Sequence, residues 1–110
     1  MKHQNALKFN LVSGQQESGN IVEGKRVGYT LLIDGNQYYL MKLFLFDKYF
    51  FIVKDSESTK TYTVYGSKFP NEPVFKNAVG SAELIEETNS HIEVSIPLLG
   101  GPFYMSLYPN

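Results

Sequence analysis

The sequence contains no cysteine, and this absence excludes several kinds of site at once. Without a thiol there is no disulfide framework, no thiolate metal centre and no cysteine nucleophile. Small secreted domains commonly depend on disulfides, so the composition favours a reducing compartment. The first 20 residues also lack the apolar core of a secretory signal peptide. We therefore expect a cytoplasmic protein.

Positive charge is scarce as well. The chain has 10 basic and 11 acidic residues, which give a formal net charge of −1, and Arg26 is the only arginine in the sequence. Arginine is the side chain best suited to bidentate contacts with phosphate or guanine. Proteins that bind nucleic acids also gather basic residues on one face. We therefore expect no nucleic-acid partner.

Long uncharged apolar runs are missing too. The most apolar stretch, residues 37–54, reads QYYLMKLFLFDKYFFIVK and is interrupted by Lys42, Asp47 and Lys48. A membrane-spanning helix needs about 18 apolar residues in succession, so we expect no membrane span. The run has no helical period and is rich in Phe, Tyr, Ile and Val, which favour strands. It predicts two strands that fold back on each other at Asp47-Lys48.

Histidines are too few to build a metal centre. His3 lies near the start of the chain, and His91 opens an alternating segment in which Glu93 shares its polar face. A metal site usually needs three or four ligands, and no further histidine or cysteine is available to complete one. We interpret His91 and Glu93 as part of a solvated strand face.

Carboxylates gather late in the chain, at Glu83, Glu86, Glu87 and Glu93. In a hairpin some of them would face one another across the strands, which is slightly destabilising at neutral pH. No aspartate-rich loop with calcium-binding spacing accompanies them. A surface for a basic partner is the functional alternative to a simply solvated face.

No arrangement of residues typical of an active site is present. Serine and threonine hydroxyls are plentiful, but none has a histidine or lysine partner that the sequence can place. The chain also lacks a G-x-S-x-G segment and a phosphate-cradling glycine loop. We expect no enzymatic activity, no metal and no cofactor.

The pattern predicts an all-β fold in a single domain, residues 1–110. Most segments alternate between apolar and polar residues, as strands with one buried face do. Seven or eight short strands follow one another with short polar turns between them. The predicted strands cover residues 6–12, 25–33, 37–46, 49–54, 59–65, 81–87, 91–96 and 103–108, of which 81–87 is ambiguous between strand and helix.

The clearest local signal is the hairpin turn at Asp34-Gly35-Asn36-Gln37. Gly and Asn suit the positive φ angles of a type I′ turn, and this turn places Leu31 opposite Leu40. Three consecutive hairpins favour a small antiparallel meander barrel, and a two-sheet β-sandwich is the alternative.

Two segments read as irregular. Residues 13–20 are polar, with a glycine near each end, and predict a mobile loop. Residues 66–80 contain Pro70 and Pro73, which cannot donate to a strand ladder, so we expect this stretch to cross between edges or layers.

The 37–54 run predicts much of the core. A two-residue turn at Asp47-Lys48 pairs Phe46 with Tyr49 and makes both faces of the hairpin apolar. The residues expected in the core are Leu43, Phe44, Leu45, Phe46, Phe51 and Ile52.

The remaining unusual feature is an excess of tyrosine in predicted strands. Tyrosine is enriched at interfaces because it buries a large area and keeps a polar group. We predict a non-catalytic binding protein that presents an aromatic β surface to a protein partner, of inhibitor or immunity type, or to a second copy of itself. The alternative is a barrel that holds a small apolar or aromatic ligand inside. The predicted binding surface consists of Tyr38, Tyr49, Tyr62, Tyr65, Tyr104 and Tyr108.

Overall fold

The computed structural model describes residues 6–33, 35, 37–56, 60–68, 74–100 and 102–109. Within these ranges most of the chain is extended, as its alternating, β-branched and aromatic segments predict. The elements in chain order are β1 (Ala6–Glu17), β2 (Asn20–Ile33), β3 (Tyr38–Leu43), β4 (Tyr49–Lys54), β5 (Thr61–Lys68), β6 (Phe75–Leu84), β7 (His91–Ser95), the short 3₁₀ helix η1 (Pro97–Leu99) and β8 (Phe103–Ser106).

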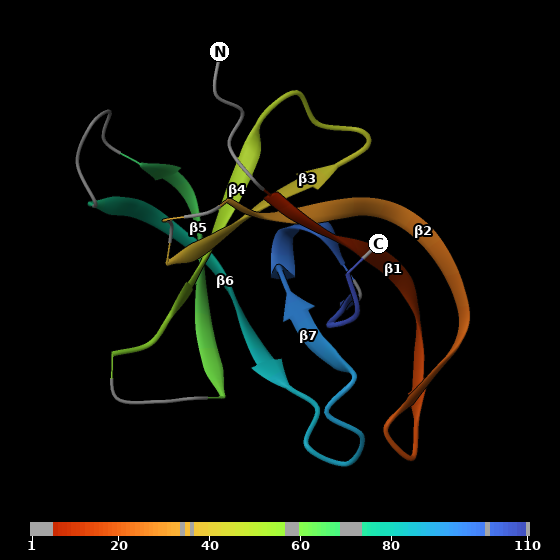
Figure 1. Ribbon diagram of the computed structural model, residues 1–110. Coiled ribbons are helices and arrows are strands. Elements are labelled where there is room, and N and C mark those ends of the chain that lie inside the picture. Colours follow the sequence, from red (N-terminus) through yellow and green to blue (C-terminus); the bar gives the residue numbers. More distant parts are fainter. Residues whose placement is uncertain are drawn as a thin grey trace.

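The eight strands close into a barrel in which each strand pairs with the next along the chain (Figure 1). Every neighbouring pair is antiparallel, and β8 returns to pair with β1, where Met105 lies opposite Leu11. Closure removes the free edge strands that a sandwich would leave. The predicted meander barrel is confirmed, and the sandwich alternative is wrong.

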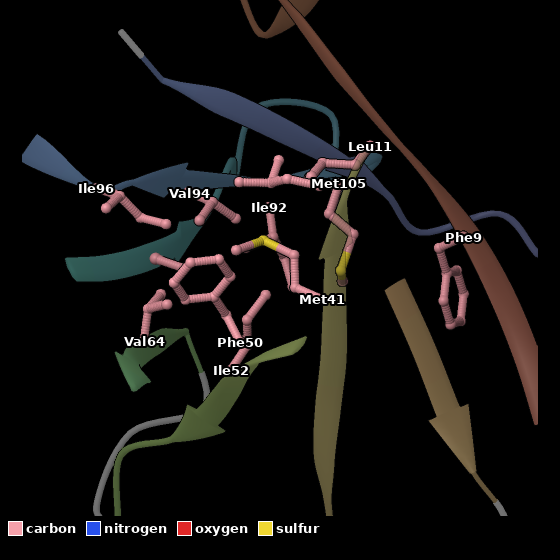
Figure 2. Close-up of a cluster of buried hydrophobic side chains, with 12 residues drawn as sticks. Phe9, Leu11, Met41, Phe50, Ile52, Val64, Ile92, Val94, Ile96 and Met105 are labelled. Atoms are coloured by element: carbon pink, nitrogen blue, oxygen red, sulfur yellow. The ribbon is translucent and has the colours of Figure 1, made fainter. Parts of the chain in front are cut away.

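Apolar side chains from alternate positions of the strands fill the interior. Met41, Ile52, Val64 and Met105 have no exposed surface, and Ile92 is only 1% exposed. Ile52 pairs with Val64 in one half of the barrel, and Ile92 pairs with Met105 in the other. Figure 2 shows the two sets facing each other across the interior.

The predicted register of the β2–β3 hairpin is confirmed. Leu31 lies opposite Leu40, and Thr30 lies opposite Met41. Gly35 has a φ of 92°, a value that glycine adopts without strain. Asp34 and Asn36, which also belong to this turn signal, lie outside the described residues.

The β3–β4 connection differs from its prediction. Tyr49 faces Lys42 instead of Phe46, a shift of four positions in the pairing. The connection therefore spans residues 44–48, between the end of β3 and the start of β4, rather than only Asp47 and Lys48. Because the shift is an even number, the residues that remain in the two strands keep their predicted faces.

Tertiary contacts hold this longer loop. Lys42 Nζ donates to the carbonyl oxygen of Leu43, at 3.0 Å, and to that of Phe46. The ring of Phe46 meets that of Phe50 edge-on, with centroids 6.0 Å apart. These contacts satisfy loop carbonyls and cover the core, so they favour the loop over a tight turn.

The shift corrects part of the predicted core. Leu43 and Ile52 are buried as predicted, and Phe46 packs partly buried against the core. Phe44 and Leu45 lie in the loop and are 53% and 94% exposed, so their assignment to the core was wrong.

Residues 13–20 form strand and turn instead of a mobile loop. They extend the β1–β2 hairpin to a turn at Ser18-Gly19, where both residues have the positive φ of a type I′ turn. Thr88 Oγ1 donates to the Gly19 carbonyl oxygen at 3.0 Å. The tip of the curved β1–β2 hairpin thus contacts the turn between β6 and β7 (Figure 1).

The segment 66–80, predicted as irregular, is largely a hairpin. β5 continues to Lys68 and β6 begins at Phe75, and these two residues pair directly. Pro70 and Pro73, on which the prediction rested, lie outside the described residues. The ambiguous segment 81–87 is strand as far as Leu84 and then turns.

Thr30 places a hydroxyl inside the barrel between Phe9 and Met41, its neighbours in the register. The side chain is fully buried, and within the described part of the chain its Oγ1 has no hydrogen-bond partner. A buried polar group without a partner is destabilising by about 1–3 kcal/mol.

We predict that Thr30→Val leaves the free energy of unfolding unchanged or raises it by about 1 kcal/mol, because a methyl group replaces the unpaired hydroxyl. Thr63→Val is the matched control, since Thr63 Oγ1 donates to Asp55 at 2.8 Å, and it should lose about 1 kcal/mol. Urea denaturation measures both. An equal loss in the two variants would contradict the prediction.

Candidate protein-interaction surface

The outer face of β2–β5 is apolar, although it points away from the barrel interior. Across these strands Leu31 pairs with Leu40, Leu40 with Phe51, and Phe51 with Tyr65, so a row of large side chains runs over four strands. Each of these residues is partly exposed. The 37–54 run predicts a hairpin that is apolar on both faces. This surface is the face that points outward.

We call this surface the apolar wall. Its members are strand residues whose side chains point outward, or residues that contact those side chains. All of them are partly exposed. They are Leu31, Ile33, Tyr38, Leu40, Phe51, Val53, Tyr65 and Phe75.

Four aromatic rings form the centre of the apolar wall. Phe75, at the start of β6, lies 5.1 Å from Tyr38, 5.7 Å from Phe51 and 5.6 Å from Tyr65, measured between ring centroids. Tyr38 also meets Phe51 edge-on at 6.0 Å. Mutual packing of this kind orients the rings and limits their freedom before any partner arrives.

A second pair of tyrosines lies beside the apolar wall. Tyr29 and Tyr49 flank Lys42 in the register, and their hydroxyl oxygens are 3.5 Å apart. The hydrogen bond with Tyr49 and partial burial raise the pKa of Tyr29 above its usual value. Tyr49 is 37% exposed, which leaves its ring accessible to a partner.

The opposite side of the barrel has a different chemistry. On the outer face of β6–β8, Glu83 lies directly opposite Glu93, and His91 lies opposite Ser106. The predicted confrontation of carboxylates across strands is therefore confirmed at Glu83 and Glu93. The barrel thus has one apolar side and one polar, acidic side.

The structure brings together only part of the predicted tyrosine surface. Tyr38 and Tyr65 belong to the apolar wall, and Tyr49 lies beside it. Tyr108 is 69% exposed but follows β8, on another part of the barrel.

Two of the predicted tyrosines are not available on the surface. Tyr62 points inward and packs partly buried against the core, because it shares the face of Val64. Tyr104 faces outward beside Glu93 but is only 2% exposed. Burial and the neighbouring Glu93 carboxylate raise the pKa of Tyr104.

The sequence interpretation missed Phe51 and Phe75 as surface residues. Phe51 was assigned to the core, yet it alternates with the buried Phe50 and Ile52 and must therefore face outward. Phe75 was placed in the irregular segment, and no local pattern indicates that it reaches Phe51.

The interior offers the alternative site, at the end of the barrel where β3 and β5 begin. Tyr39 lies edge-on to Phe9 at 5.9 Å and to Tyr62 at 6.4 Å, measured between ring centroids. Burial raises the pKa of both tyrosines, with a further contribution from Tyr62 to that of Tyr39. The hydroxyls of Tyr39, Tyr62 and Thr30 place polar groups on the inward side of the described strands.

His91 ends a chain of hydrogen bonds. Thr88 Oγ1 contacts Ser90 Oγ at 2.8 Å, and Ser90 Oγ contacts His91 Nδ1 at 2.9 Å. Thr88 gives its single hydroxyl proton to Gly19, so it accepts from Ser90, and Ser90 in turn accepts from His91 Nδ1–H. The arrangement assigns His91 a role in holding the hairpin tip. Among the described residues no cluster of three or more histidine and carboxylate side chains could bind a metal ion.

We predict a pH dependence of stability that His91 causes. Burial lowers the pKa of His91 below its ordinary value of 6.5, so the unfolded chain binds the proton more readily than the folded one. The contribution of His91 to stability is therefore complete above pH 6.5 and falls as the pH drops from there toward the folded pKa. Urea unfolding of the parent and of His91→Gln, measured across this range, should give profiles that diverge on the acidic side. Parallel profiles would refute the prediction.

In the part of the chain that the structure describes, no helix is long and apolar enough to cross a membrane. No family model matches the chain, and neither a curated protein nor a solved structure shows significant similarity to it.

Proposed function

We propose that this chain is a non-catalytic binding protein that docks another protein on the apolar wall. The observation that carries the proposal is the cluster of Tyr38, Phe51, Tyr65 and Phe75 on the outside of a closed barrel. A monomer needs its core inside the barrel, and aromatic residues gathered outside it are typical of interfaces.

Accessible residues beside the apolar wall also support the proposal. Phe44 and Leu45 project from the β3–β4 loop with 53% and 94% of their surface exposed. Removing such exposed apolar area from water contributes about 25 cal/mol per Å², before the entropic cost of association is subtracted. Neither side chain belongs to the buried core of the described residues, so burial inside the barrel does not account for their apolar character.

The cysteine-free composition favours a reducing compartment for this interaction, so the cytoplasm is part of the proposal. The absence of a placed nucleophile and base in the sequence is the reason to propose binding without catalysis.

A ligand held inside the barrel is the second candidate. The fully buried and unpaired hydroxyl of Thr30 is the observation that favours it. Against it, the register neighbours of Thr30 are the side chains of Phe9 and Met41, which are buried at 5% and 0% exposure.

Site-specific photo-crosslinking tests the leading proposal. A benzophenone amino acid replaces Phe51 in the full chain, produced in its native cells, and Tyr108 carries the same group as the matched exposed control. We expect a discrete adduct with another protein from position 51 and none of the same mass from position 108. Adding Leu40→Thr should reduce the yield from position 51. The absence of a discrete adduct, or the same adduct from both positions, would overturn the proposal.

A further inference from the structure

Cations border the apolar wall and the adjoining β3–β4 loop. Lys8 Nζ lies 4.7 Å from the centre of the Tyr29 ring, and Arg26 Cζ lies 5.7 Å from that of Phe44. Lys42 donates hydrogen bonds to the carbonyl oxygens of Leu43 and Phe46. We call the set of Lys8, Arg26, Lys42 and Lys48 the cationic rim.

Lys48 completes the cationic rim at the end of the loop. Its Nζ lies 5.6 Å from the centre of the Phe50 ring and donates to the Gly66 carbonyl oxygen at 3.3 Å. Cations placed over rings and carbonyls keep their charge next to apolar surface rather than fully in water.

Among the described residues, carboxylates on the same side are fewer. Asp47 is exposed in the β3–β4 loop, and Asp55, after β4, accepts hydrogen bonds of 2.8 Å from both Thr61 and Thr63. The four cations of the rim therefore outnumber the two described carboxylates near them. On the far side lie Glu83, Glu86, Glu87 and Glu93, and the sequence has no Lys or Arg after Lys76. The charges of the described residues are therefore distributed asymmetrically over the barrel.

From this asymmetry, and resting on the proposed function, we propose that the partner is a protein whose contact region combines apolar side chains with carboxylates. Its apolar part would cover the apolar wall together with Phe44 and Leu45, while its carboxylates would meet the cationic rim. Complementary charge at the edge of an apolar contact speeds association and rejects wrong partners.

A second copy of this chain fits the surface less well. A two-fold symmetric dimer through the apolar wall would bring one cationic rim against the other, and like charges at an interface are destabilising. A head-to-tail contact would place the apolar wall on the outer face of β6–β8, where it would cover Glu83 and Glu93, two like charges that lie opposite each other.

An anionic lipid surface also fits less well. It could take up Phe44 and Leu45 at the tip of the loop, with the cationic rim near the headgroups. It would leave the rings of Tyr38, Phe51, Tyr65 and Phe75 in water, because they lie along the barrel wall and not at the loop. A protein can contact both regions at once.

Two synthetic peptides of equal length test the partner chemistry, one with phenylalanine alternating with glutamate and one with lysine in place of every glutamate. Each is titrated into the ¹⁵N-labelled full chain. We expect the acidic peptide to shift amide resonances of β2–β5, of the 44–48 loop, and around Lys8 in β1 and Phe75 in β6. It should bind at least about tenfold more tightly than the basic one, a difference of 1.4 kcal/mol, and added salt should weaken it.

Variants locate the effect. Lys8→Glu combined with Arg26→Glu should abolish the preference for the acidic peptide, whereas Lys60→Glu, the same kind of charge change beside Glu86, should leave it. Lys42 and Lys48 are left in place because they hold backbone carbonyls.

Several results would overturn the inference. These are equal binding of the two peptides, preference for the basic one, shifts centred on β7 and β8, and no binding of either. Tighter binding to phosphatidylserine vesicles, or a dimer in sedimentation that Phe51→Thr dissociates, would also overturn it. The crosslinking experiment judges the proposed function separately, since an adduct from position 51 without a preference for acidic peptides defeats only this inference.

Discussion

Replacing Phe50 by alanine should lower the free energy of unfolding by about 3–5 kcal/mol, the usual result of emptying a buried phenylalanine site. Phe50 is 7% exposed and pairs with Met41. Its ring and that of Phe46 meet edge-on. Phe44→Ala is the matched substitution in the same apolar run. Phe44 is 53% exposed, so we expect its loss to change stability by less than about 1 kcal/mol.

Urea denaturation with a common slope for all variants measures this difference. The register of β3 and β4 determines the outcome, since it separates the buried Phe50 from the loop residue Phe44. Similar losses of unfolding free energy from both substitutions would contradict the observed register. They would mean that Phe44 is a core residue.

The two neighbouring hairpins show why one turn could be predicted and the other could not. The β2–β3 turn depends on backbone angles that Gly35 adopts locally, so three adjacent residues contain the information. The β3–β4 loop depends on the reach of Lys42 to two carbonyl oxygens and on the Phe46–Phe50 contact. Such contacts join residues whose distance apart is known only after the strands have paired.

The extension of β1 and β2 was missed for a related reason. Residues 13–20 are mostly Gln, Ser, Gly and Glu, which have low strand propensity. Their strands are stabilised by pairing within the hairpin and by the hydrogen bond from Thr88 to Gly19. Tertiary context therefore overrode the local preference.

The candidate surface was predictable in part. Alternation in residues 61–65 already places Tyr62 on the same strand face as Val64 and Tyr65 on the opposite face. The two tyrosines could therefore not share one outer surface. The same reasoning applied to Phe50 and Phe51 would have moved Phe51 to the outside. The position of Phe75 was beyond this reasoning, because it depends on the length of the β5–β6 hairpin and on the bulge between Val64 and Tyr65.

Gly28 and Gly80 lie so close to neighbouring strands that neither position should tolerate a side chain. A Cβ atom on Gly28 would overlap the carbonyl oxygen of Lys42, and one on Gly80 would overlap that of Ser95. The atoms in the way belong to the backbone of a paired strand, which cannot move without disturbing the ladder. Both glycines lie within long strands of the barrel, where closure requires bending and close approach of backbones.

We therefore expect Gly28→Ala and Gly80→Ala each to lower the free energy of unfolding by about 3 kcal/mol, at the upper end of the usual effect of overpacking. Gly66→Ala is the control, because Gly66 is also buried but the nearest atom to its Cβ would be the Asn77 carbonyl oxygen at an ordinary 3.6 Å. Urea denaturation compares the three, and amide resonances of β3 and β7 report whether the neighbouring strand has moved. If the three alanines behave alike, backbone contact does not limit these positions, and the tight closure of the barrel at Gly28 and Gly80 is refuted.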